Sequence, residues 1–114
     1  WCAVPRAWRA QGVRRYGFHG LAYESVMSQL PPSARQERVL LGHLGSGASL
    51  CAVLHGRSIA TTMGFSALDG LPMGTRCGSI DAGAVLHLLR QPGMTLSSVE
   101  RMLSDRSGLL GVSG

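Results

Sequence analysis

The stretch RVLLGHLGSGASLCAVLHGRSIATTM, residues 38–63, decides the fold. Two short apolar runs, 38–44 and 48–54, flank a Gly-Ser-Gly turn, and a His-Gly turn precedes a third run over 57–63. Short runs of aliphatic and β-branched residues between glycine turns are typical of β-strands. The pattern predicts a meander of three strands.

The residues before this meander favour helix with a turn-rich link. Residues 5–11 predict a short helix, because a proline suits a first turn and Gly12 can end it. Residues 14–20 form a turn-rich stretch, and residues 21–30 predict a helix that Pro31-Pro32 closes.

The residues after the meander predict a loop and then helices. Residues 64–78 are rich in glycine, which indicates a loop. Residues 81–89 and 96–105 carry apolar residues at helical spacing. We expect no closing element over 109–114. The chain is therefore predicted to be α/β, with segments 1–37, 38–63 and 64–114.

Helix-end signals accompany the last predicted helix. Thr95 is a candidate N-cap, and Ser97 with Glu100 has the spacing of a capping box. Gly108 is a candidate helix stop.

The charge pattern disfavours a nucleic-acid partner. The net charge is +5, all eleven basic residues are arginine, and the only adjacent pair is Arg14-Arg15. A nucleic-acid footprint clusters its charge and adds aromatic residues for stacking, whereas only 5% of residues here are aromatic. The scattered arginines therefore disfavour a nucleic-acid-binding domain, whose binding would be strongly salt-dependent.

Cellular context is read from the cysteines and the apolar stretches. Cys2, Cys51 and Cys77 are an odd number without metal-type spacing, so we expect no metal ligands, a reduced cytoplasmic protein and a packed Cys77. No apolar stretch is long enough to cross a bilayer, so no membrane contact is expected. The chain begins at Trp1 without a signal-type segment, which suggests that its natural N-terminus is missing.

Three stretches could carry chemistry. RRYGFHG (14–20) holds a histidine between glycines, HLGSGAS (43–49) is a glycine turn that can aim N–H groups at an anion, and MGFSALDGLPMGTRCG (63–78) carries Arg76 in a glycine-rich loop. Each also has a purely structural reading as a surface turn, a hairpin or an exposed loop. His55 and His87 lack such settings and are expected to be structural.

Taken together and in this order, these stretches resemble the acetate kinase family (acetate and propionate kinases). The ending SGLLGVSG, residues 107–114, is similar to that family too. The resemblance implies a ribonuclease H-like α/β fold of the acetate and sugar kinase/actin superfamily. It also implies transfer of a phosphoryl group between ATP and acetate, or another short-chain carboxylate, with Mg²⁺, in a homodimer. A family member is several times longer, so we expect an internal piece that is inactive alone.

The resemblance also implies roles for individual residues. His19 and Arg76 would stabilise the transferring phosphoryl group, and Phe18 and Ala67 would line the acyl pocket. The turn near the ATP phosphates would comprise His43, Leu44, Gly45, Ser46 and Gly47.

The sequence departs from the family pattern at both of these sites. Ser46 replaces an Asn in the phosphate turn, and Ala67 replaces a Pro at the acyl pocket. The Phe-Asp-Thr-Ala-Phe-His segment with the family's catalytic Asp and the adenosine-binding region are absent from these residues. The alternative is a non-catalytic module that binds an anion or a nucleotide through Gly45–Gly47.

Overall fold

The computed structural model describes residues 2–114. The chain divides into two compact units, Trp1–Ala67 and Leu68–Gly114, and each is described by itself. Among the described residues, no helix is long and apolar enough to cross a membrane.

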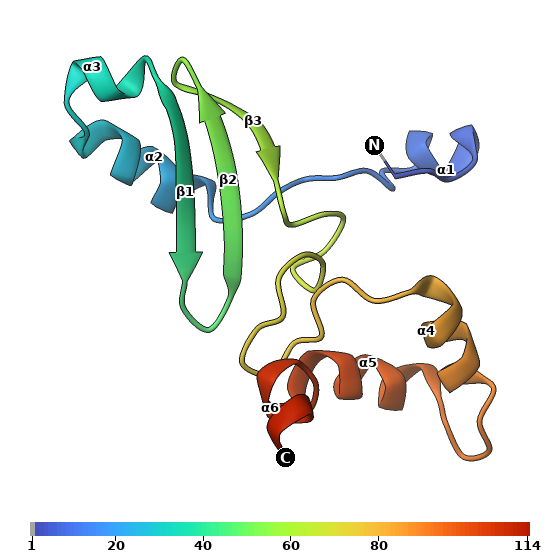
Figure 1. The fold of residues 1–114 in the computed structure, drawn as a ribbon. Helices are drawn as coiled ribbons and strands as arrows, with labels where there is room; N and C mark the ends of the chain where they lie inside the picture. Colours follow the sequence, from blue (N-terminus) through green and yellow to red (C-terminus); the bar gives the residue numbers. More distant parts are fainter. Residues whose placement is uncertain (1) are drawn as a thin grey trace. The chain divides into compact units, whose positions relative to one another are not determined.

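The first unit is built on the predicted strand meander (Figure 1). Its elements, in chain order, are α1 (Arg6–Ala10), α2 (Gly20–Gln29), α3 (Pro32–Arg35), β1 (Arg38–Leu44), β2 (Ala48–Leu54) and β3 (Arg57–Thr61). The sheet order is β1-β2-β3, and both pairs are antiparallel. The first two strands have the predicted bounds, because the glycine turn separates two apolar runs cleanly.

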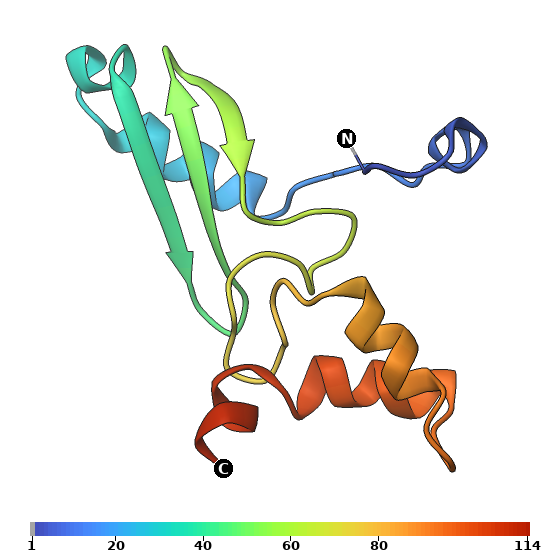
Figure 2. The same cartoon turned by 45° about the vertical axis from the view of Figure 1, so that its right-hand side comes forward.

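Helix α2 covers one face of the sheet, as Figures 1 and 2 both show. Its Tyr23 packs in a buried cluster with Leu41 of β1 and Cys51 and Val53 of β2. These strand residues share a face because side chains alternate along a strand and Leu41 pairs with Cys51. The core of this unit therefore lies between α2 and the sheet.

The opposite face of the sheet is apolar and exposed. Leu40, Leu44 and Ile59 are 68%, 81% and 63% exposed. Leu40 and Ile59 border a shallow apolar groove together with Ala52 and Leu54. Antiparallel sheets that leave one face in water normally carry polar residues there.

Strand β3 is shorter than the predicted run over 57–63. It ends at Thr61. The Arg15 guanidinium donates to the carbonyls of Thr61, Thr62 and Met63, at 3.4, 3.3 and 3.1 Å. These bonds hold the chain where it leaves the sheet, and the Thr62 N–H still donates to the Leu50 carbonyl of β2 at 3.0 Å.

The second unit comprises a loop and the helices α4 (Ala82–Leu89), α5 (Leu96–Asp105) and α6 (Gly108–Ser113). Helices α4 and α5 pack together, and α5 buries Val99 and Leu103. The expected N-cap at Thr95 is confirmed: its side chain accepts from the Ser98 N–H at 3.2 Å. The partner in the capping box is Ser98, so the Ser97 and Glu100 pairing was wrong.

The expected open end over 109–114 was also wrong, as was the helix stop at Gly108. Gly108 begins α6 and has φ +62°. The short helix is stabilised by tertiary bonds rather than by its own propensity, because the Leu109 N–H donates to the Met73 carbonyl at 2.9 Å. No local pattern in these residues signals that bond.

Helix α3 was not predicted either. It spans Pro32–Arg35, the residues after the proline pair that was expected only to end α2. Its Arg35 side chain donates to the Leu30 carbonyl at 2.7 Å and to the Ser28 carbonyl at 2.5 Å. The arginine thereby satisfies carbonyl groups at the end of the preceding helix.

Candidate active site

The glycine turn between β1 and β2 is the first component of the site. The Gly45 N–H donates to the Gly47 carbonyl at 2.9 Å, so it is committed within the turn. Among the hydrogen bonds of residues 2–114, the N–H groups of Ser46 and Gly47 donate to no backbone carbonyl. These two groups are the ones that an anion at the turn could use.

The strand register places His43 beside this turn. His43 of β1 pairs with Ser49 of β2, so both side chains point to the face of the sheet that carries α2. The His43 Nε2 atom lies 3.5 Å from the position that a Cβ on Gly45 would occupy. The imidazole therefore lies beside the turn, at the distance of an ordinary van der Waals contact from that position.

His19 stacks on His43 at this face of the sheet. It is the N-cap residue of α2 and has a left-handed backbone with φ +63°, which is uncommon for a residue with a side chain. The two imidazole rings stack with centroids 3.8 Å apart and planes 15° apart. The structure thus brings His19 to the same place as His43 and the glycine turn.

Two hydroxyl groups form a hydrogen-bonded chain that ends at the His19 ring. The His19 Nδ1 atom lies 2.8 Å from the Ser49 Oγ atom, and Ser49 is fully buried. The Ser49 hydroxyl also bonds to the hydroxyl of Tyr23, which is buried in the core cluster. Tyr23 has no motif signal in the sequence; its position four residues after His19 on a helix is the one hint.

Phe18 borders a hollow of about 310 Å³ in the same unit. Tyr23, Met27 and Val53 also line it. The buried Oγ1 atom of Thr61 has no hydrogen-bond partner among residues 2–114, and Thr61 lines this hollow as well. Glu24 and Ser58 line the hollow as well, so its wall is mixed apolar and polar, as in sites for small ligands.

Ala67 does not border this hollow. It is partly buried and ends the first unit. Its assignment to the acyl pocket, like that of Phe18, stays a prediction.

The arginine pair in the first motif serves the fold. Arg15 clamps the end of β3, and the Arg14 guanidinium lies 5.0 Å from the centroid of the Tyr16 ring. Cation–π and carbonyl contacts of this kind stabilise a turn without any ligand. The structural reading therefore accounts for both side chains.

Arg76 lies in the second unit, in a loop that is bonded to helices. Its carbonyl accepts from the Met73 N–H at 3.0 Å, and its Nη1 atom lies 3.8 Å from the Met73 Sδ atom. The neighbouring Cys77 N–H donates to the Leu103 carbonyl at 2.9 Å. The loop is thus fixed within its unit, whereas the meeting of Arg76 with His19 stays a prediction.

Cys77 is a partly buried free thiol. Burial raises the pKa of this thiol above its ordinary value of 9.0, a backbone hydrogen bond lowers it, and the Asp69 charge raises it. The Sγ atom donates to the Gly78 carbonyl at 3.1 Å. A thiol with a raised pKa is a poor nucleophile, which agrees with the expected packed role.

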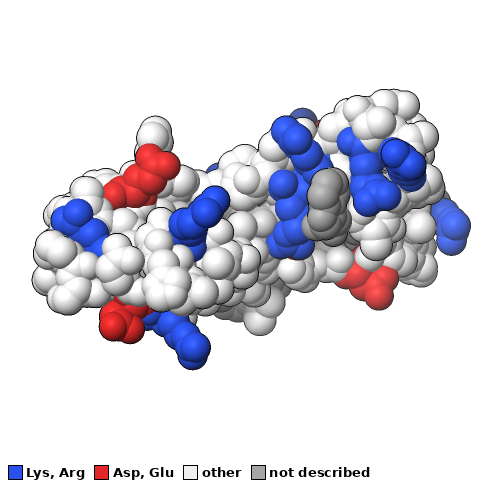
Figure 3. Space-filling model, turned by 90° about the horizontal axis from the view of Figure 1, so that it is seen from above, with Lys and Arg blue, Asp and Glu red and all other residues white. Residues whose placement is uncertain are grey.

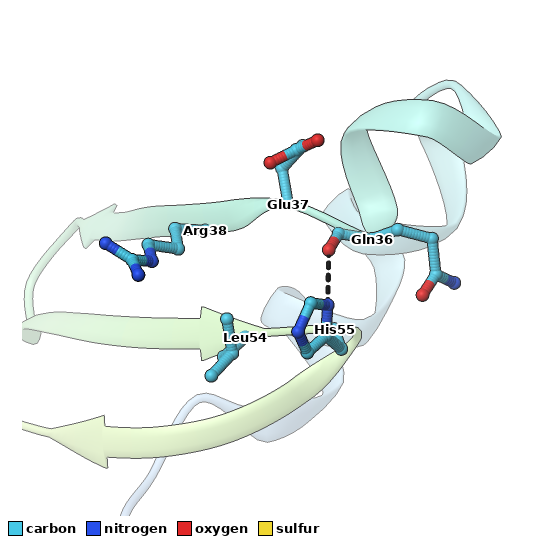
Figure 4. Close-up of a pocket in the computed structure, with 5 residues that line it drawn as sticks. All are labelled: Gln36, Glu37, Arg38, Leu54 and His55. Atoms are coloured by element: carbon cyan, nitrogen blue, oxygen red, sulfur yellow. Dashed lines mark hydrogen bonds between the residues drawn. The ribbon is translucent and has the colours of Figure 1, made fainter.

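His55 has a structural partner, as expected. It occupies the turn between β2 and β3 with φ +48°, and its Nδ1 atom lies 2.5 Å from the Gln36 carbonyl oxygen (Figure 4). The figure shows this bond at the edge of a hollow that Arg38 and Leu54 also line. The bond ties the turn to the end of α3.

The basic charge is dispersed on the face that Figure 3 shows. The blue arginine side chains there form separate groups, with red acidic groups among them. The expectation that the protein binds no nucleic acid stays a prediction.

Within residues 2–114, no group of three or more His, Cys, Asp or Glu side chains could hold a metal ion.

Comparison with known proteins shows the family to which the chain belongs. The model of the acetokinase family matches residues 1–114. The acetate kinase of Rhodopseudomonas palustris strain TIE-1 is 59% identical over 116 residues, and the propionate kinase of Yersinia enterocolitica is 48% identical over 117 residues. Each match covers 98% of this chain and 29% of the relative, so the chain spans under a third of the length of these curated relatives.

Solved structures agree with the sequence comparison. The crystal structure of Porphyromonas gingivalis acetate kinase matches with a TM-score of 0.88 and 34% identity, covering 98% of this chain and 29% of that one. A propionate kinase from Francisella tularensis matches with a TM-score of 0.89 and 37% identity, with 98% and 30% covered. The predicted α/β class, with a strand meander followed by helices, is confirmed, and the chain belongs to the acetokinase family.

Proposed function

We propose that this chain is part of a kinase that transfers a phosphoryl group between ATP and a short-chain carboxylate, acetate or propionate, giving an acyl phosphate and ADP. The observation that carries the proposal is the group formed by His19, His43 and the glycine turn at Gly45–Gly47. It joins ring nitrogens and backbone N–H groups on one face of a sheet, in a family that includes acetate and propionate kinases.

The chemistry of phosphoryl transfer suits these groups. Catalysis depends on positioning the phosphates in line and on donors around the equatorial oxygens, with little covalent help from the protein. In the proposal, the turn with the N–H groups of Ser46 and Gly47 holds the ATP phosphates. His19 and Arg76 then donate to the transferring group. Phe18, with Ala67, borders the acyl group of the carboxylate.

Mg²⁺ accompanies ATP in this proposal and would neutralise phosphate charge. The residues described here do not form a metal cage, so none of them is assigned to the metal. The enzyme is further proposed to be a cytoplasmic homodimer.

A chimeric enzyme tests the proposal. The host chimera is the acetate kinase of R. palustris strain TIE-1 with its matching segment replaced by this chain. We expect it to form acetyl phosphate in a hydroxamate assay, because the matching segment is 59% identical over 116 residues. Arg76→Ala should lower kcat by roughly 100- to 1000-fold, as expected when one donor to the transition state is lost.

Two results would count against this proposal. Detectable ATP binding by residues 1–114 alone, without turnover, would favour the alternative, a nucleotide-binding module. An Arg76→Ala variant with near-parental kcat would remove Arg76 from the reaction. Loop residue Arg106→Ala serves as a control for the loss of one exposed positive charge in the same unit.

A further inference from the structure

A chain of hydrogen bonds runs from the core of the first unit to His19. The Tyr23 hydroxyl bonds to the Ser49 Oγ atom, which lies 2.8 Å from the His19 Nδ1 atom. Ser49 is 0% exposed and Tyr23 is 8% exposed, so neither hydroxyl is part of the surface. These polar groups interrupt an otherwise apolar cluster, and a buried polar chain of this kind tends to fix one arrangement.

We infer that Ser49 and Tyr23 are positioning residues that hold the His19 ring with its Nε2–H directed to the phosphate oxygens of the substrate. The inference rests on the proposed function, because it assigns a role at the same site. It adds two residues whose hydroxyl groups act through His19.

The supply of hydroxyl protons favours one tautomer of His19. A hydroxyl has one proton, so when Tyr23 donates to Ser49, Ser49 donates to Nδ1 of His19. Nδ1 is then an acceptor, and the ring proton lies on Nε2. With the opposite tautomer, the Ser49 oxygen would accept from Nδ1–H, and the proton of either the Ser49 or the Tyr23 hydroxyl would have no acceptor within this chain of bonds.

Two contacts together fix the orientation of the ring. The stack on His43 fixes the plane, with 15° between the rings, and the Ser49 bond fixes the rotation within that plane. The left-handed backbone of His19, with φ +63°, places the ring between these contacts at the start of α2. An uncommon backbone conformation persists where surrounding contacts determine it, and such residues cluster at functional sites.

Kinetics of the host chimera test the inference. Tyr23→Phe removes one hydroxyl and should lower kcat about tenfold while the KM for ATP stays within about twofold. Ser49→Ala should act in the same direction. In a His19→Ala background both changes should have almost no further effect, because their role passes through the imidazole.

A control variant, and the comparison of variants with and without His19, distinguish a positioning role from a purely structural one. Ser28→Ala removes an exposed hydroxyl from the same helix and should leave kcat unchanged. Equal losses with and without His19 would overturn the inference, since a purely structural role is additive. Unchanged kcat in Tyr23→Phe would overturn it too, while an active chimera would leave the proposed function standing.

The tautomer of His19 gives a test that does not depend on activity. Nitrogen-15 labelled histidine in the host chimera, with the His19 signal identified by its loss in His19→Ala, should show a proton on Nε2. Ser49→Ala should raise the share of the Nδ1–H form. An Nδ1–H form in the parent protein refutes the positioning role, whether or not the chimera turns over.

Discussion

Replacement of Gly108 by alanine tests how the loop of Arg76 is held. Gly108 has φ +62°, and a Cβ there would lie 2.1 Å from the Met73 carbonyl oxygen and 2.5 Å from the Arg76 carbonyl oxygen. Real Cβ atoms do not approach backbone oxygens so closely, so either the loop or the start of α6 must shift. The substitution therefore acts on the backbone of Met73 and Arg76, which close the turn through their own hydrogen bond.

The size of the effect follows from two contributions. Alanine in a left-handed conformation costs about 1 kcal/mol. Relieving an overpacked contact costs about 1–3 kcal/mol. The sum, about 2–4 kcal/mol, corresponds to a roughly 30- to 900-fold larger opening equilibrium for this part of the chain.

Hydrogen exchange in the host chimera measures that opening. The amides to follow are those of Ser107 and Leu109, which donate to the carbonyls of Thr75 and Met73 at 2.9 Å. Gly74→Ala is the matched control, because a Cβ at Gly74, in the same loop, would meet no atom within 4 Å. Equal exchange rates in the two variants would refute this account, and kcat should fall only in Gly108→Ala.

Three further predictions concern other parts of the chain. Because burial raises the pKa of the Cys77 thiol above 9.0, the folded state holds that proton more tightly. Its contribution to stability is present below pH 9 and is lost as the pH rises through the higher folded pKa. The unfolding free energy of the parent should therefore fall more steeply above pH 9 than that of Cys77→Ala. Parallel curves of unfolding free energy against pH for the two proteins would contradict this. Thr95→Ala should lower the unfolding free energy by about 1 kcal/mol, whereas Ser97→Ala should change it little, because Ser98 completes the capping box. The isolated chain should self-associate through its apolar sheet face; in sedimentation, Leu40→Lys with Ile59→Lys should raise the monomer fraction, whereas Leu21→Lys, 85% exposed on α2, should not.

The sheet could be predicted from the sequence because its signals are local. Glycine turns separate the apolar runs, and the bounds of β1 and β2 follow from them. Helix α6 could not be predicted in this way, since it contains two glycines and depends on bonds to Met73 and Gly74. Thr95 is recognisable as a cap, but the choice of Ser98 over Glu100 depends on side-chain geometry.

Some residues of the candidate site can likewise be identified from local sequence motifs, and others cannot. Sequence motifs single out His19, His43 and the glycine turn, because glycine flanks the histidines at short range. Tyr23 carries no such signal, and its link to His19 appears only when α2 lies on the sheet and Ser49 faces it. A buried hydroxyl pair is a tertiary feature, so no reading of residue types along the chain could assign it.

The length of the β1–β2 turn connects the fold to the proposed chemistry. Leu44 pairs with Ala48 across the turn, and this register sets His43 opposite Ser49. Because side chains alternate, a slip of one residue in either strand would turn one of the two to the exposed apolar face and break the pairing. The turn that offers the N–H groups of Ser46 and Gly47 to an anion therefore also fixes the register on which His19 depends. The motif is one structural unit rather than a phosphate loop alone.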